Sequence, residues 1–180
     1  MPFLRSTVLL LLTLALLIGC GGGNTPAGGA PTMNSNLSVA QLKDKIEDNH
    51  PAVYYQLALK LFDEGKKDEA VFWFYLGQLR YRFHLSVAKN LDPSGDPALF
   101  ASFSQVIGQP LNEYAFGDIP KLAKTIDEVL AWDASHPNGF TAKQGNEAAL
   151  DNIRKGLTGL KDHVILNEAS IKAERKANGL

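Results

Sequence analysis

The side chains with the most reactive chemistry are a single cysteine thiol and four imidazoles. Cys20 is the only cysteine among 180 residues, which excludes an intramolecular disulfide framework and any multi-cysteine metal site. The histidines are scattered, and no metal-ligand spacing joins them to carboxylates; they are His50, His84, His136 and His163. The sequence therefore predicts no metal ion and no small-molecule cofactor.

Catalytic motifs are also missing from the sequence. It contains no G-x-S-x-G nucleophile elbow, no H-E-x-x-H, no P-loop and no G-x-G-x-x-G. Asp162 and His163 could supply a base, but no nucleophile is placed beside them. His50 and His136 each precede a proline, and we expect both to be polar surface residues. The sequence predicts no catalytic residues and a protein that is not an enzyme.

An aromatic segment over residues 70–85 holds the remaining candidate residues. Two apolar stripes run along it, so we expect a helix inside the domain with Phe72, Trp73, Phe74 and Leu76 in the core. The same helix carries two arginines and a histidine, which an apolar environment does not accommodate without carboxylates or solvent.

Two interpretations of these polar residues are open. They form a partner-binding patch made of Arg80, Tyr81, Arg82 and His84, or an arginine forms an internal ion pair with Glu113 or Asp118. The internal pair is favoured because the helix is so apolar. The loop 108–120 adds Tyr114 and Phe116 as candidate partner-binding residues, with packing between helices as the alternative.

The amino-acid composition limits the kinds of partner that the protein can bind. Eighteen basic and nineteen acidic residues give a formal charge of −1, with 45% hydrophobic and 21% charged residues. These values exclude a strongly basic nucleic-acid binder and a fully disordered chain. We therefore expect a folded protein with no nucleic-acid partner.

The N-terminus has the organisation of a secretory signal. Arg5 precedes an eleven-residue apolar run from Val8 to Ile18, in which Thr13 is the one polar residue. A transmembrane helix needs about 20 apolar residues, so this run fits the core of a signal peptide.

Leu17-Ile18-Gly19-Cys20 resembles the lipobox of bacterial lipoproteins. The resemblance implies that residues 1–19 are a signal peptide, that Cys20 carries diacylglycerol, and that palmitate or a similar acyl chain caps the new amino terminus. An ordinary signal peptide with a chance cysteine is the alternative. Gly21 in place of aspartate implies sorting to the outer membrane, facing the periplasm. The covalent lipid on Cys20 would be the membrane contact.

A linker separates this segment from the folded domain. Residues 21–36 contain five glycines and two prolines and no core-forming pattern, so 20–36 reads as the lipidated cysteine with a flexible tether. Residues 37–180 remain as one domain of 144 residues.

That domain is predicted to be all-α, a compact bundle of antiparallel hairpins. Alternating strand patterns are nearly absent and helical periodicity is frequent. We expect helices at 39–47, capped by Ser38, and at 51–64, 67–90, 97–107, 110–116, 118–134 and 146–178, the last being one helix or two.

One predicted hairpin resembles a tetratricopeptide unit, more closely its Sel1-like variant. Leu57-Ala58 is followed by Gly65 and then by Ala70-x-x-Trp73-Phe74-x-x-Gly77. The resemblance implies two antiparallel helices that cross at small residues and turn at glycine, with aromatic residues filling the groove toward a neighbour. No 34- or 36-residue period extends it into a regular solenoid.

The C-terminal segment carries an apolar stripe with 3-4 spacing. Its positions are Leu150, Ile153, Leu157, Leu160, Val164, Asn167 and Ile171. A terminal helix packed on its own bundle explains this stripe, and a homodimer seam through 150–171 is the alternative. Gly156 and Gly159 mark either a break or a close helix approach.

These features together predict a lipid-anchored cell-envelope protein whose repeat-like helical domain binds an envelope or periplasmic protein. A periplasmic immunity or inhibitor lipoprotein that neutralises a secreted toxin is a second hypothesis. An enzyme acting on envelope polymers is a third, disfavoured because no converging carboxylates are visible.

Overall fold

The computed structural model describes residues 36–180, which form eight α-helices, one short 3-10 helix and no strand. In chain order they are α1 (Val39–Lys43), η1 (Ile46–Asp48), α2 (Ala52–Asp63), α3 (Lys67–Val87), α4 (Asp96–Val106), α5 (Gly108–Ala115), α6 (Ile119–Ser135), α7 (Glu147–Leu166) and α8 (Glu168–Ala177). The all-α prediction is confirmed. The predicted signal peptide 1–19, Cys20 and all but the last residue of the linker lie outside the described residues.

The hairpin of α2 and α3 forms because small residues stand where the two helices meet. Gly65 turns the chain with φ +77°, a conformation that side chains other than glycine rarely adopt. A Cβ at Gly77 would lie 2.8 Å from the Cβ of Tyr54, so only glycine permits this close approach. Ala58 and Ala70 are fully buried between the helices. The antiparallel hairpin expected from the sequence is present.

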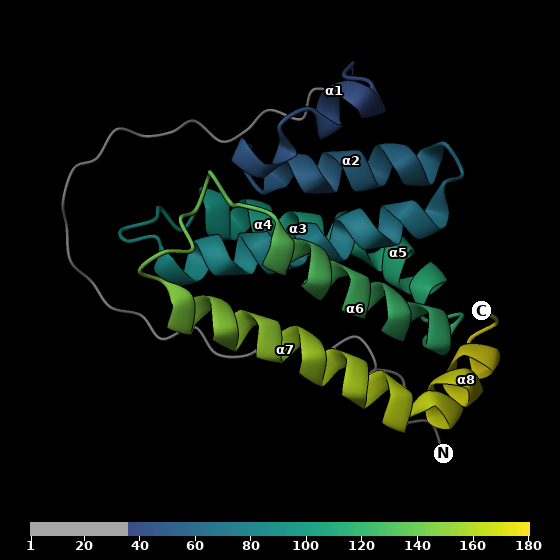
Figure 1. Ribbon diagram of the computed structural model, residues 1–180. Helices are drawn as coiled ribbons and strands as arrows, with labels where there is room; N and C mark the ends of the chain where they lie inside the picture. The colour runs from purple at the N-terminus through teal and green to yellow at the C-terminus, as the bar shows by residue number, and fades with distance from the viewer. Residues whose placement is uncertain (1–35) are drawn as a thin grey trace.

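Helix α3 is the central element of the bundle. Figure 1 shows α2 along one side of α3, α6 and α7 along the other, and α4 and α5 behind it. Burial on several faces explains why the sequence of α3 shows two apolar stripes instead of one. Phe74 and Leu76 are buried as expected, whereas Phe72 and Trp73 are only half-buried.

Two predicted helices are interrupted. Ser38 caps α1 through the expected side-chain hydrogen bond, but the chain breaks at Lys45, which has φ +46°, before η1. After the break, the Ile46 carbonyl accepts from the Asn49 N–H at 3.1 Å and from the Tyr54 hydroxyl at 3.0 Å. The C-terminal segment breaks at Asn167, between α7 and α8, and not at Gly156 or Gly159.

The apolar stripe of the C-terminal segment packs on its own bundle. Leu150, Val164 and Ile171 are buried in the core, and Ile153, Leu157 and Leu160 lie against it. Helix α7 contacts both α3 and α6. The stripe thus packs within the chain, as the packing alternative expected, and Ile153, Leu157 and Leu160 stay partly exposed. No helix of residues 36–180 is long and apolar enough to cross a membrane.

Candidate functional site

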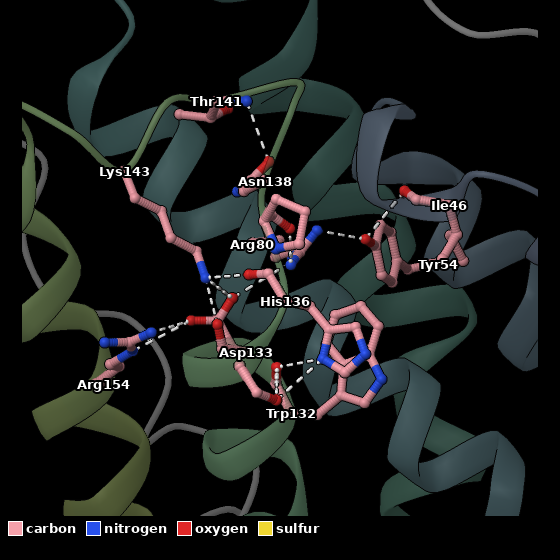
Figure 2. Close-up of polar contacts among 12 residues, drawn as sticks. Ile46, Tyr54, Arg80, Trp132, Asp133, His136, Asn138, Thr141, Lys143 and Arg154 are labelled. Atoms are coloured by element: carbon pink, nitrogen blue, oxygen red, sulfur yellow. Dashed lines mark hydrogen bonds and ion pairs between the residues drawn. The ribbon is translucent and has the colours of Figure 1, made fainter.

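Two carboxylates near the C-terminal end of α3 each gather several polar partners. We call the first group the Asp133 cluster; it consists of Arg80, Asp133, Lys143 and Arg154 (Figure 2). We call the second the Asp96 cluster; it consists of His50, Tyr81, His84 and Asp96. Both lie next to the loop 136–146, which joins α6 to α7.

The Asp133 cluster surrounds a fully buried carboxylate with three cations. Arg154 donates to Asp133 Oδ2 from Nη2 at 2.6 Å and from Nε at 3.1 Å. On the other oxygen, Oδ1, Arg80 Nε donates at 3.3 Å and Lys143 Nζ lies 3.5 Å away. Figure 2 shows these side chains converging on Asp133 from α3, α7 and the loop 136–146.

Arg80 has every branch of its guanidinium occupied although its side chain is only 1% exposed. Besides Asp133, it donates to the Tyr54 hydroxyl at 2.7 Å and to the Pro137 carbonyl at 2.6 Å. Its guanidinium carbon also lies 4.9 Å from the ring centre of Trp132. A buried guanidinium needs partners of this kind, because an unpaired charge in the interior is strongly unfavourable.

The excess positive charge of the Asp133 cluster acts on its lysine. Burial lowers the pKa of the Lys143 ammonium; Asp133 opposes the shift, while the charges of Arg80 and Arg154 add to it. Lys143 also donates to the His136 carbonyl at 2.6 Å and to the backbone carbonyl of Asp133. The cluster therefore connects the loop 136–146 to three helices. We call this set of buried ion pairs, which stabilises the packing, a structural lock.

The Asp96 cluster brings together residues from three separate segments. Asp96, in the first turn of α4, accepts from Tyr81 Oη at 3.0 Å and pairs with His50 Nε2 at 3.1 Å through Oδ1. Its other oxygen lies 3.1 Å from His84 Nε2. The side chains of His50, His84 and Asp96 are 16%, 14% and 18% exposed, so the cluster is shielded but reachable from solvent.

The hydrogen bonds determine where the imidazole protons lie. The Ala52 backbone N–H donates to His50 Nδ1 at 3.1 Å, so this nitrogen carries no hydrogen and Nε2 donates to Asp96. An ionised carboxylate only accepts, so His84 Nε2 likewise carries a hydrogen. The other nitrogen of His84 lies 3.2 Å from the Thr141 hydroxyl.

Burial and hydrogen bonding shift the titration of this cluster. Burial lowers the pKa of His50, with Asp96 opposing the shift. Burial alone would raise the pKa of the Asp96 carboxyl, but His50 and the hydrogen bonds from Tyr81, His50 and His84 outweigh it and lower that pKa. Burial also raises the pKa of the Tyr81 hydroxyl, which remains a donor. At neutral pH the cluster holds an ionised carboxylate and a neutral His50.

The loop 136–146 covers the Asp96 cluster. The Phe140 ring lies 4.7 Å from the ring centre of His50 and 5.0 Å from that of His84, and Phe140 is 39% exposed. Gly139 N donates to the Glu47 carbonyl at 2.9 Å, which fastens the loop to η1. The same loop thus contacts both clusters.

The structure places the residues of the predicted patch on α3 in different surroundings. Arg80 and Tyr81 are 1% and 0% exposed, so neither is available to a protein partner. The prediction of an internal arginine–carboxylate pair is confirmed, but the partner is Asp133 and not Glu113 or Asp118. Arg82 is half-buried, donates to Gln78 Oε1 at 3.1 Å and does not join either cluster.

The second predicted pair, Tyr114 and Phe116, lies at the opposite end of α3. Both are partly buried against the core. Tyr114 Oη donates to Asp68 Oδ1 at 2.7 Å, at the N-terminal end of α3. Tyr114 lines a surface hollow of about 350 Å³ bordered by Asp68, Lys121 and Arg175.

Sequence reasoning missed the Asp96 cluster. His50 was expected on the polar surface, and this expectation is wrong, because Tyr81, His84 and Phe140 pack against its ring. The three groups that meet are 34 and 12 residues apart, so no local spacing reveals them. The proline after His50 and the aspartate at the start of α4 were visible separately.

Comparison with known proteins identifies little. No protein-family model matches the chain, and no solved structure matches it. An uncharacterized protein of Haemophilus influenzae is 38% identical over 97 residues, which is 51% of this chain and 37% of that protein. The chain thus spans well under half the length of this relative.

Proposed function

We propose that the protein is a lipid-anchored cell-envelope protein whose helical domain binds a protein partner at the membrane surface. The observation that carries the proposal is the sequence Leu17-Ile18-Gly19-Cys20, placed directly after an eleven-residue apolar run and containing the only cysteine. A thiol at this position is the acceptor for a diacylglycerol thioether. Several acyl chains on one residue give stable anchoring where one chain is marginal.

The predicted tether favours a domain that binds a partner outside the lipid over a domain that acts within the membrane. The glycine-rich composition of residues 21–36 predicts a tether, and a glycine-rich chain of this length has a root-mean-square reach of roughly 20–25 Å. The folded domain can then reorient while it stays near the lipid. The outer membrane, with the domain facing the periplasm, is the location implied by Gly21.

The partner surface that we propose is the hollow beside Tyr114. Burial removes Arg80 and Tyr81 from consideration, whereas Tyr114 and Phe116 stay at least partly accessible. The hollow combines an aromatic ring with the Arg175 guanidinium and the Lys121 ammonium. Tyrosine and arginine are enriched in protein interfaces, which favours a protein segment as the occupant.

Membrane fractionation of cells producing the chain tests the anchor. The unsubstituted protein should sediment with membranes and incorporate labelled palmitate, and Cys20→Ser should abolish both. Ser6→Ala, which leaves the cysteine in place, is the matched control. Retention of Cys20→Ser in the membrane fraction would sink the anchoring proposal.

Photo-crosslinking in the cell envelope tests the surface. A photoreactive residue at Phe116 should give a discrete adduct with one envelope protein, whereas the same residue at Lys155, exposed on α7, should not. Adducts of equal yield at both positions would place the contact elsewhere.

A further inference from the structure

We propose that His50, His84 and Asp96 form a binding site for a divalent cation of the zinc type. One ligand atom from each of the three residues lies within 4.8 Å of the other two. The inference rests on the Asp96 cluster alone and is independent of the lipid anchor and of any protein partner.

The distances come close to those of a metal site. Zn²⁺ binds imidazole nitrogen at about 2.0–2.1 Å, so ligand atoms in a tetrahedral site lie about 3.4 Å apart. The pairs His50 Nε2–Asp96 Oδ1 and His84 Nε2–Asp96 Oδ2 are both 3.1 Å apart. The two pairs use different carboxylate oxygens, so the side chains must rotate to bring ligand atoms that lie within 4.8 Å of one another to the spacing around a single ion.

The surroundings match what a metal site requires beyond its ligands. A ligating carboxylate is usually hydrogen-bonded by a neighbour, and the Tyr81 hydroxyl donates to Asp96 Oδ1 at 3.0 Å. A ligating imidazole usually donates its other N–H, and the Thr141 hydroxyl lies 3.2 Å from His84 Nδ1 as an acceptor. Both groups are in place before the ion binds, and the Thr141 hydroxyl changes from donor to acceptor when His84 Nδ1 gains its hydrogen.

Binding changes the tautomer of both rings. Without an ion the Nε2 atoms carry the hydrogens, so coordination through Nε2 moves each hydrogen to Nδ1. In His84 the new N–H can donate to Thr141. In His50 it meets the Ala52 N–H, and that hydrogen bond is lost. Ala52 is the first residue of α2 and is fully buried, so the loss of this acceptor is a cost that ion binding must exceed.

The number of ligands defines the type of site. Two imidazoles and one carboxylate leave the fourth tetrahedral position to water, the arrangement of an open site. Phe140 packs against both imidazole rings and is 39% exposed, so it is the partly exposed side chain next to the site. Imidazole with carboxylate selects Zn²⁺ and similar first-row ions over Ca²⁺ or Mg²⁺.

Metal titration of the full chain in detergent micelles tests the site. We expect Zn²⁺ to bind one ion per chain and to raise the melting temperature, with reversal by a chelator. Co²⁺ should give the visible absorption of four-coordinate nitrogen and oxygen ligation. His50→Gln and His84→Gln should each weaken Zn²⁺ binding by at least about tenfold, since loss of an outer partner alone costs about 10–100-fold.

Matched controls separate this site from other ligands. His163→Gln, on the exposed surface of α7, and Cys20→Ser should both bind Zn²⁺ as the unsubstituted chain does. Equal binding by His50→Gln and the unsubstituted chain would overturn the proposal, as would loss of binding in Cys20→Ser. If a glutamine variant fails to fold, absence of any Zn²⁺-dependent rise in the melting temperature of the unsubstituted chain overturns it instead.

Discussion

The Asp133 and Asp96 clusters share one arrangement, a shielded carboxylate that accepts from several side chains, but the chemistry of the donors differs. Each places one carboxylate among several donors near the C-terminal end of α3. Asp133 is surrounded by two arginines and a lysine and is 0% exposed at its side chain, whereas Asp96 is paired with two histidines and a tyrosine and is 18% exposed. The two arginines of the first set stay charged at every physiological pH, whereas an imidazole, the group present only in the second set, can change its protonation.

This difference indicates which cluster holds the fold and which can respond to its surroundings. A guanidinium cannot release its proton, so the pairs of Asp133 with Arg80 and Arg154 stay ionic. An imidazole can exchange a proton for a metal ion without leaving its place. The loop 136–146 contacts both, through the Pro137 carbonyl on one side and Thr141 on the other. The Asp96 cluster thus contacts the loop at Thr141, between the two positions, Pro137 and Lys143, at which the Asp133 cluster holds it.

The largest effect should come from Asp133→Asn. The substitution leaves the buried Arg80 guanidinium without its counter-charge, and breaking a buried pair in this way costs about 3–5 kcal/mol. Urea denaturation measures the loss in free energy of unfolding. Asp127→Asn, on the same helix but in an exposed pair with Lys161, is the control and should change stability little. Equal losses in free energy of unfolding for Asp133→Asn and Asp127→Asn would contradict the distinction between the buried ion pairs of Asp133 and an exposed surface pair.

Asp96→Asn should have an intermediate effect. An amide keeps one acceptor for Tyr81 but presents a donor to one of the histidines, and such a mismatched buried group costs about 1–3 kcal/mol. The same denaturation measurement applies. A loss as large as that of Asp133→Asn would show that the Asp96 cluster is also a structural lock.

Arg154→Gln should have a smaller effect than either carboxylate substitution. Arg154 donates twice to Asp133, but its side chain is 30% exposed and water can compensate in part, so we expect about 1 kcal/mol. Lys155→Gln, in an exposed pair one residue along α7, is the matched control. A loss above that of Asp133→Asn would contradict the assignment of Arg80 as the critical buried cation.

The smallest effect should be a pH dependence confined to the Asp96 cluster. Because burial lowers the pKa of His50 below 6.5, the unfolded chain binds more protons than the folded chain just below that pH. The contribution of His50 is thus present above pH 6.5 and is lost as the pH falls toward the lowered pKa. The groups that face His50 are Tyr81 and His84 on α3, Asp96 on α4, and the uncharged Phe140.

Thermal unfolding between about pH 7 and 5.5 measures this slope. His50→Gln should flatten it, whereas Arg154→Gln should lower stability by the same amount at each pH. An unchanged slope in His50→Gln would assign the pH dependence to other groups.

Much of the fold could be predicted because it depends on local signals. Ser38 as a cap, Gly65 as a turn and the periodicity of α6 and α7 each act within a few residues. The break at Lys45 was missed because no glycine or proline marks it, and the hydrogen bond from Tyr54 to the Ile46 carbonyl that accompanies it forms only when α2 folds back.

The candidate site was only partly predictable for the same reason. The apolar surroundings of Arg80 indicated an internal pair, but the choice of Asp133 depends on how α6 lies against α3. His50, His84 and Asp96 come from three segments, and no spacing in the sequence relates them. Single residues could be recognised as polar within apolar helices, while their partners required the packed structure.

The most direct test of the contrast between the two clusters is the tautomer of each histidine, measured by ¹⁵N NMR on the full chain in detergent with and without Zn²⁺. We predict that His50 carries its hydrogen on Nε2 without the ion, and that His50 and His84 both switch to Nδ1–H when Zn²⁺ binds. His136 and His163 should not change. A spectrum in which Zn²⁺ leaves His50 and His84 unaltered would contradict the account.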